Sequence, residues 1–345
     1  MTTLPETIAT EEELDHLLSE PTPAAVAGLS QAPGDLLLLG AGGKMGLSQA
    51  LMAKRAVDQL GDNRRIIAVS RFSDLAAREA LQQHGIETLA GDLLDEDFVA
   101  SLPDAPNVIH MTGMKFGSGA QPSLTWGTNV YMASLVARRF RHSRIAAYST
   151  GNVYPLVPID SGGSQETDPL APIGEYAMTA LGRERMFDFL SRRYSIPLAL
   201  LRLNYAVELR YGVLVDIAQQ VWAETPIDVS MGYANVIWQA DACAMTLAAL
   251  GETTSPPFVL NVAGPERLSI RETALQFGDL LGKRVEIVGQ EQPSALLNNG
   301  EAGHRRFGSP RVTADQIIRW IAAWISSGGR LLGKPTRFEV RDGKF

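Results

Sequence analysis

A glycine-rich loop between an apolar run and a helical segment is the feature that most constrains the fold of this chain. Leu36–Leu39 is a continuous apolar run, which is typical of a central parallel strand covered on both faces. Gly40, Gly43 and Gly46 follow it, and residues 45–60 have a helical pattern. Glycines in these places allow a tight turn, close backbone approach to a diphosphate and close packing of helix on strand. The amides and dipole of the helix start favour an anion, so the loop predicts binding of a dinucleotide.

The elements around this loop predict a Rossmann-type α/β fold. Further strands are expected at 65–70, 87–90, 108–111, 145–148 and 198–203, with helices at 74–84, 96–102, 124–142 and 175–194 between them. This alternation implies right-handed crossovers and a doubly wound parallel sheet.

Three regions are expected along the chain. Residues 1–34 form an N-terminal helical leader, whose first helix begins at a capping box of Thr10 and Glu13. Residues 35–204 form the dinucleotide-binding Rossmann domain. Residues 205–345 are mainly a smaller, interleaved substrate-binding lobe that returns to the main sheet at about 236–264.

Composition excludes several classes of function. The 345 residues carry a net charge of -7, which disfavours nucleic acid as a partner. Cys243 is the only cysteine and the five histidines are scattered, so we expect no disulfide and no metal site. An acidic N-terminal segment without a long apolar run predicts a cytoplasmic protein with no membrane partner.

The end of the second strand indicates which dinucleotide binds. An acidic residue is expected there when NAD binds, because it accepts hydrogen bonds from the adenosine ribose hydroxyls. Ser70 and Arg71 stand in that place. A guanidinium suits the 2′-phosphate of NADP, so we expect NADP to be preferred over NAD, although an ordinary surface pair would look the same.

Further segments follow in a regular order: Gly91-Asp92-Leu93, Val108–Gly117 with Lys115, Asn129, Tyr148–Tyr154 with Thr150, Tyr176, Arg202-Leu-Asn204-Tyr, Trp238-Gln-Ala-Asp241 and Asn261–Gly264. With the glycine loop, these resemble the extended short-chain dehydrogenase/reductase family, of the NAD(P)-dependent epimerase/dehydratase type that includes UDP-glucose 4-epimerases. The resemblance covers about residues 35–290.

The resemblance and the glycine loop together imply the site residues. Thr150 and Tyr176 would be catalytic. Candidate cofactor contacts are Gly40, Gly43, Lys44, Met45, Gly46, Ser70, Arg71, Asp92, Leu93, Thr112, Gly113, Lys115, Asn129, Tyr176 and Asn204. Candidate substrate contacts are Lys115, Asn152, Arg210 and Trp238, with Tyr211 as a further lining group. A sugar, sugar acid or sugar-nucleotide-like substrate would offer hydroxyls to asparagine and an anion to arginine.

One expected residue is absent. The family pattern is Tyr-x-x-x-Lys, whereas this chain reads Tyr176-Ala-Met-Thr-Ala180. One helical turn after the tyrosine, the lysine ammonium lowers the pKa of the phenol, and alanine supplies no such charge. Three interpretations are open. In the first, Arg183 or Lys115 supplies the positive charge of the missing lysine, although Arg183 could equally be a solvated charge on the helix surface. In the second, Tyr176 stays neutral and only donates a hydrogen bond to the substrate. In the third, the catalytic chemistry is lost.

We therefore expect an NAD(P)-dependent oxidoreductase or epimerase/dehydratase that transfers a hydride at a secondary alcohol or ketone, with an altered proton relay. The alternative is a catalytically inactive dinucleotide-binding sensor or scaffold. By resemblance, helices 124–142 and 175–194 would form the contact of a homodimer.

Overall fold

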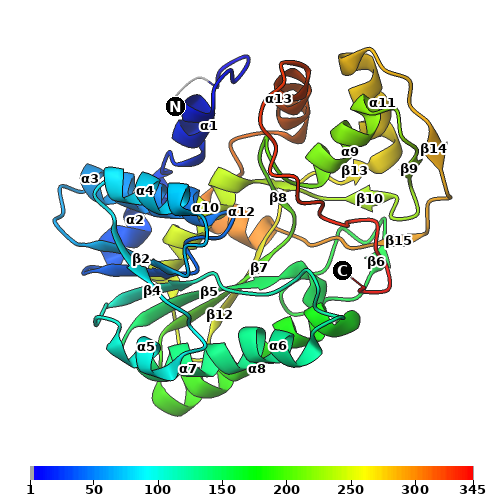
Figure 1. Cartoon of the computed structure of the whole chain (residues 1–345). Coiled ribbons are helices and arrows are strands. Elements are labelled where there is room, and N and C mark those ends of the chain that lie inside the picture. Colours follow the sequence, from blue (N-terminus) through cyan, green and yellow to red (C-terminus); the bar gives the residue numbers. More distant parts are fainter. Residues whose placement is uncertain (1–3, 345) are drawn as a thin grey trace.

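The computed structural model describes residues 4–344, and its centre is a seven-stranded parallel sheet (Figure 1). The strand order is β3-β2-β1-β4-β5-β7-β12. The strands are β1 (Leu36–Leu39), β2 (Ile66–Ser70), β3 (Glu87–Ala90), β4 (Asn107–His110), β5 (Arg144–Thr150), β7 (Leu198–Leu203) and β12 (Phe258–Val262). β1 is central, since Leu36 pairs with Ile66 on one side and with Asn107 on the other. This doubly wound sheet confirms the predicted fold class.

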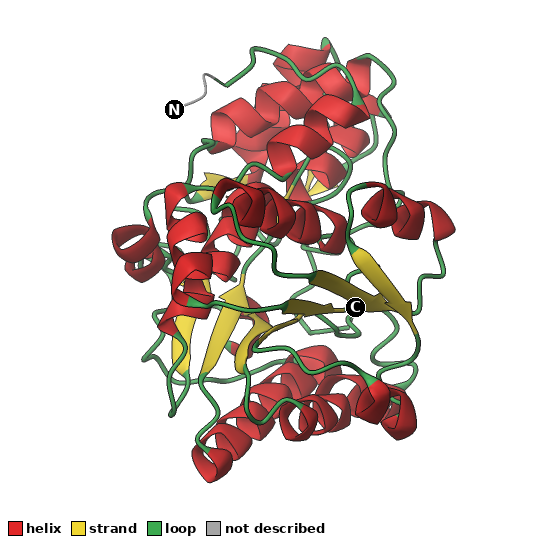
Figure 2. Ribbon diagram, turned by 90° about the vertical axis from the view of Figure 1, so that its left-hand side faces the viewer, coloured by secondary structure: helices red, strands yellow, loops and turns green. Residues whose placement is uncertain are grey.

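Helices cover both faces of the sheet (Figures 1 and 2). One face carries α2 (Pro23–Gln31), α3 (Gly46–Gln59), α4 (Leu75–Gln83) and α10 (Gln239–Ala249). The other carries α5 (Glu96–Ser101), α6 (Pro122–Trp126), α7 (Met132–Arg139) and α8 (Gly174–Tyr194). Because successive side chains of a strand alternate, Leu36 and Leu38 enter one apolar core, whereas Leu37 and Leu39 enter the other.

The helix expected over 124–142 is interrupted. A π-helical turn, Gly127–Tyr131, separates α6 from α7. It contains the buried Asn129, whose side chain is bonded to neighbouring elements. Such π-turns are frequently found at functional sites.

After β7 the chain builds a second layer of short elements. Its helices are α9 (Val213–Trp222), α11 (Ile270–Leu281), α12 (Glu301–Phe307) and α13 (Ala314–Ser326). Two-residue strands pair as β8 (Ala206–Val207) with β11 (Ile237–Trp238), β9 (Ile227–Asp228) with β14 (Ile287–Val288), β10 (Tyr233–Ala234) with β13 (Leu268–Ser269), and β6 (Val157–Pro158) with β15 (Ser294–Ala295). β12 returns to the edge of the main sheet beside β7.

The N-terminal leader packs on the domain. The predicted Thr10–Glu13 capping box is present at the start of α1 (Glu11–Leu18). Leu14 and Leu18 of α1, and Ala25 and Leu29 of α2, are buried in the core. Arg210 pairs with Glu11, Asp15 and Glu208, which ties the leader to the segment after β8.

A C-terminal tail, residues 327–344, leaves α13, passes β8 and ends near β6 and β15 (Figure 1). Phe338 is buried in the core, and the backbone amide of Thr336 donates to Asp216 of α9. No part of the sequence pattern predicted this path. None of the helices within residues 4–344 is long and apolar enough to cross a membrane.

Candidate functional site

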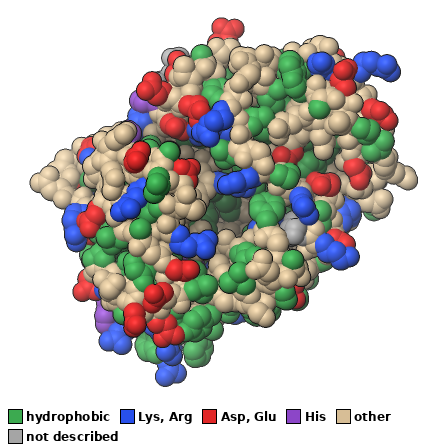
Figure 3. Space-filling view, viewed as in Figure 1, with side chains coloured by type: hydrophobic (Ala, Val, Ile, Leu, Met, Phe, Trp, Pro, Cys, Tyr) green, Lys and Arg blue, Asp and Glu red, His purple; other side chains and the backbone are tan. Residues whose placement is uncertain are grey.

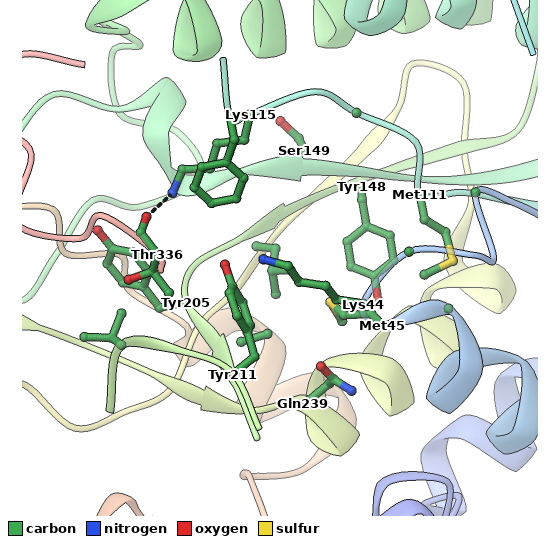
Figure 4. A pocket seen from close by; sticks show the side chains of 18 of the residues that line it. Lys44, Met45, Met111, Lys115, Tyr148, Ser149, Tyr205, Tyr211, Gln239 and Thr336 are labelled. Atoms are coloured by element: carbon green, nitrogen blue, oxygen red, sulfur yellow. Dashed lines mark hydrogen bonds between the residues drawn. The ribbon is translucent and has the colours of Figure 1, made fainter. Parts of the chain in front are cut away.

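A cavity of about 410 Å³ opens where β1, β4, β5 and β7 end (Figure 4). The strand order reverses between β1 and β4, and open α/β sheets bind ligands at such a switch point. Its walls come from the glycine loop, the loop after β4, the end of β5, α8, the segment after β7 and the tail: Gly40, Gly43, Lys44, Met45, Gly46, Met111, Gly113, Lys115, Phe116, Tyr148, Ser149, Arg183, Leu203, Tyr205, Ala206, Tyr211, Val213, Gln239 and Thr336. Figure 3 shows a hollow rimmed by lysine and arginine side chains on the same face.

The glycine loop requires its glycines. Gly40 has φ +95°, and a Cβ there would lie 2.7 Å from Thr112 Oγ1. A Cβ at Gly46 would lie 2.0 Å from the Ala41 carbonyl oxygen. No side chain within residues 4–344 caps the start of α3, so its first amides can donate to an anion. The loop therefore fits the diphosphate of a dinucleotide.

The predicted adenosine contacts lie at the ends of β2 and β3. Ser70 is beside the loop, since a Cβ at Gly42 would lie 2.5 Å from its Oγ. Arg71 and Asp92 are exposed. Leu93 is buried in the core and does not face solvent.

Asn129 fixes the loop that follows β4. Its Oδ1 accepts from the Met114 amide at 2.8 Å, and its Nδ2 donates to the Met114 carbonyl at 3.0 Å and to Thr179 Oγ1 at 2.8 Å. The asparagine thus ties the loop carrying Gly113 and Lys115 to α8.

Thr150 and Tyr176 lie next to the cavity, but neither is among the residues that line it. Thr150 ends β5, and its hydroxyl donates to Asn152 Oδ1 at 3.0 Å. Tyr176 lies in the first turn of α8 and is half-buried, with Lys115 Nζ 5.9 Å from its ring centroid. Ser149, next to Thr150 in the chain, and Arg183, seven residues after Tyr176, line the cavity directly.

Residues 37–207 match the sequence model of the NAD dependent epimerase/dehydratase family. Through these residues the chain belongs to that family. No curated protein sequence matches the chain at a significant level.

Solved structures agree with this family in fold. The dTDP-glucose 4,6-dehydratase of Streptomyces venezuelae, solved with NAD and TYD, has a TM-score of 0.73 at 18% identity, over 85% of this chain and 97% of its own. The UDP-glucuronic acid 4-epimerase of Bacillus cereus, with UDP-glucuronic acid and NAD, has a TM-score of 0.71 at 17% identity, over 85% and 99%. The UDP-glucose 4-epimerase of Thermotoga maritima has a TM-score of 0.69 at 14% identity, over the same shares.

The structure shows what surrounds the position of the family's missing lysine. Ala180 is fully buried and packs against Val153 and Tyr154. Arg183, further along α8, is only 4% exposed and lines the cavity, so it is not a solvated surface charge. Its Nη1 donates to the Thr112 carbonyl at 2.7 Å. Burial lowers the pKa of Arg183, and interaction with Tyr176 and Glu184 partly opposes that shift.

Burial also changes the titration of the other cavity groups. It lowers the pKa of Lys44 to about 7, helped by repulsion from Lys334 and Lys115. It lowers the pKa of Lys115 to about 8, against the attraction of Asp216 and Glu339. The pKa of His110, behind Arg183, falls to about 3 through burial and then the charge of Arg183, so this imidazole is neutral.

Several residues predicted from the family landmarks lie away from the cavity. Arg210 is held by the three carboxylates that join it to the leader. Trp238 is 2% exposed and packs against Trp320, with 5.5 Å between ring centroids. Asn204 is buried and donates to Asn235 Oδ1 at 2.7 Å. Asn152 lines a second, much smaller cavity, whereas Lys115 and Tyr211 line the main one.

Sequence reasoning missed Phe116, Ser149, Tyr205 and Thr336. Ser149 and Tyr205 adjoin the predicted Thr150 and Asn204, so chain adjacency could have found them. Thr336 had no signal, because only the path of the tail brings it beside Lys115.

Proposed function

We propose that this protein is an NAD(P)-dependent oxidoreductase or epimerase/dehydratase. It would transfer a hydride at a secondary alcohol or ketone of a sugar, sugar acid or sugar-nucleotide-like substrate. The observation that carries the proposal is one cavity lined both by an uncapped glycine loop and by two cations, Lys115 and Arg183, that interact with Tyr176. Its family and the sugar-nucleotide enzymes among its structural neighbours support the substrate class.

In this proposal each wall has a separate task. The amides at Gly43 and at the start of α3 bind the diphosphate, and Ser70 and Arg71 bind the 2′-phosphate of NADP. The bound dinucleotide supplies the hydride acceptor and donor. Tyr176 and Thr150 orient the reacting oxygen of the substrate through their hydroxyl groups.

The proton relay divides the role of the missing lysine between two cations. Arg183 remains protonated, so its charge stabilises the oxygen of Tyr176 without releasing a proton. Lys115 has a pKa of about 8 and can therefore gain or lose a proton near neutral pH. The alternative is an inactive dinucleotide sensor or scaffold. The only observation that favours it is that Ala180 stands in the place of the family's lysine.

Two measurements test the proposal. Mass spectrometry of the purified protein, followed by calorimetry with NAD, NADH, NADP and NADPH, should identify a bound dinucleotide. Tyr176→Phe should then lower turnover of a converted sugar by at least about 100-fold while the dinucleotide affinity is kept. Binding of no dinucleotide to ligand-free protein would refute the proposal, and binding without an effect of Tyr176→Phe would favour the sensor.

We also propose a homodimer. Exposed apolar side chains lie along α6, the π-turn and α8, including Leu124, Trp126, Tyr131, Met178 and Phe189. Apolar groups in such a row favour burial against a second copy.

A further inference from the structure

The C-terminal tail contributes walls to two adjoining cavities at the site. Tyr205 lines the main cavity and also a second cavity, whose other walls include Asn152 and the tail residues Val340, Arg341 and Gly343. This second cavity has a volume of about 20 Å³, which is about enough for one water molecule. On this side of Tyr205 the space beyond the main cavity is therefore limited to about one water molecule.

The tail is held in place by buried contacts. The amide of Thr336 donates to Asp216 at 2.7 Å, and the Thr336 carbonyl accepts from Lys115 Nζ at 3.1 Å. Arg341 donates to the Ser294 carbonyl at 2.7 Å and to Ser294 Oγ at 2.8 Å. Gly343 is packed so closely that a Cβ on Gly174 would lie 2.4 Å from its carbonyl oxygen. The tail is thus a wall of the folded site.

The main cavity has the size of a site for one small ligand. Cavities of about 300–1,000 Å³ hold one drug-sized ligand, and the main cavity has about 410 Å³. The nicotinamide half of the cofactor must share this volume with the substrate. A nucleotide-linked sugar would bring a nucleoside and a diphosphate as well as its sugar.

Two ammonium groups enter the same cavity around one aromatic ring (Figure 4). Lys44 Nζ lies 5.0 Å from the Phe116 ring centroid and 3.2 Å from that of Tyr211. Lys115 Nζ lies 5.4 Å from the Phe116 centroid. Asp216 and Glu339 are the carboxylates that interact with these lysines, and Asp216 already accepts from Thr336. An additional anion between the two lysines would be attracted by both.

We propose that the substrate is a small, unlinked sugar acid whose carboxylate binds between Lys44 and Lys115, with the tail excluding nucleotide-linked sugars. This inference rests on the proposed function, since it names the substrate of the same site. The carboxylate is distinct from the diphosphate of the cofactor, which the amides of the glycine loop bind.

A panel of matched compounds tests the substrate class. The full chain with its preferred dinucleotide is incubated with D-glucuronate and D-galacturonate, with D-glucose and D-galactose, and with UDP-glucuronate and UDP-glucose. Products are followed by cofactor absorbance and by NMR. A free acid should be converted with a kcat/KM at least 100-fold above its neutral and UDP-linked counterparts. A higher kcat/KM for a UDP-linked sugar, or conversion of no free acid, would overturn the inference.

A variant of Lys44 tests the carboxylate contact. Lys44→Met should raise KM for the free acid at least tenfold and leave dinucleotide affinity within threefold of the parent. Lys54→Met is the control, because Lys54 lies on α3, the helix that follows Lys44, and pairs with Asp58 outside the cavity. Loss of dinucleotide affinity without a change in KM for the acid would show that Lys44 contacts an anionic group of the cofactor and not the substrate carboxylate. That result would overturn the inference. Failure of the proposed function itself appears separately, in the dinucleotide titration and in Tyr176→Phe.

Discussion

The guanidinium of Arg183 donates to the carbonyl oxygen of Thr112, with 2.7 Å between Nη1 and the oxygen. This bond joins α8 to the loop after β4 and places a positive charge in the cavity wall. Tyr176 lies seven residues earlier, which is about two turns along the same face of α8. A cation is therefore present near the tyrosine although position 180 is alanine.

Arg183→Met should lower kcat by roughly tenfold or more, because the positive charge near Tyr176 is lost. The carbonyl of Thr112 also loses its partner, which costs about 1–3 kcal/mol in free energy of unfolding. Steady-state kinetics and urea denaturation measure the two effects. Arg185→Met, on the exposed side of the same helix, should change neither. A kcat equal to that of the parent would exclude Arg183 from the proton relay.

Arg71→Ala should weaken NADPH binding by roughly 10–100-fold, as expected for the loss of about 1.5–3 kcal/mol from a charged hydrogen bond. The affinity for NADH should stay nearly unchanged, because NADH has no 2′-phosphate. Isothermal calorimetry with both reduced cofactors gives the ratio. Equal loss for NADH and NADPH would contradict the assignment of Arg71 to the phosphate.

Glu184 and Arg202 form a buried pair at 2.8 Å, with side chains 4% and 6% exposed. The same arginine donates to the hydroxyl of Tyr154 at 2.7 Å, and Ser149 donates to the same glutamate. Glu184→Gln leaves a buried cation unpaired, so it should lower the free energy of unfolding by about 3–5 kcal/mol. Asp188→Asn breaks an exposed pair with Arg192 on the same helix and should cost less than about 1 kcal/mol. Similar urea midpoints for the two variants would contradict this ranking.

The sheet could be predicted because local sequence determines it. Leu36–Leu39 is apolar at every position, and the following glycines can occupy a turn that side chains cannot. The parallel direction of the later strands followed from their alternation with helices. The π-turn at Gly127–Tyr131 escaped prediction, because the sequence there retains an ordinary helical pattern.

The site was less predictable because it depends on distant contacts. Arg210 was expected at the substrate, yet the leader residues Glu11 and Asp15 pair with it from almost 200 positions away. Trp238 is the first residue of a family landmark, but it is buried and packs against Trp320. Thr336 reaches Lys115 only because of the path of the tail. Chain position alone could not reveal these contacts.

Phe189→Glu should convert the proposed homodimer into a monomer, because it places a charge in an apolar contact of α8. Phe189 is 56% exposed in the single chain. Sedimentation velocity across a range of protein concentrations measures the change in mass. Leu275→Glu on α11 is the control, since Leu275 is 49% exposed outside the proposed contact. A parent protein that sediments as a monomer at every concentration would refute the dimer.

The two cavity lysines should make stability depend on pH. The pKa of Lys44 is lowered to about 7 and that of Lys115 to about 8, mainly by burial, from 10.5. Between about pH 7 and 10.5 the unfolded chain therefore binds more protons than the folded chain, so these lysines make stability rise with pH.

The double variant Lys44→Met/Lys115→Met should lack this contribution. The urea midpoint should rise from pH 7 to pH 9 by more in the parent than in the variant. The difference between these two pH slopes isolates the contribution of the two lysines from that of all other groups. Parallel slopes would contradict the lowered pKa values.

An anion bound between the lysines favours their protonated forms, so D-glucuronate should reduce the pH slope of the parent's urea midpoint. D-glucuronate should also bind more weakly as the pH rises above 8. Neutral D-glucose should have no such effect, which separates the charge of the ligand from its size.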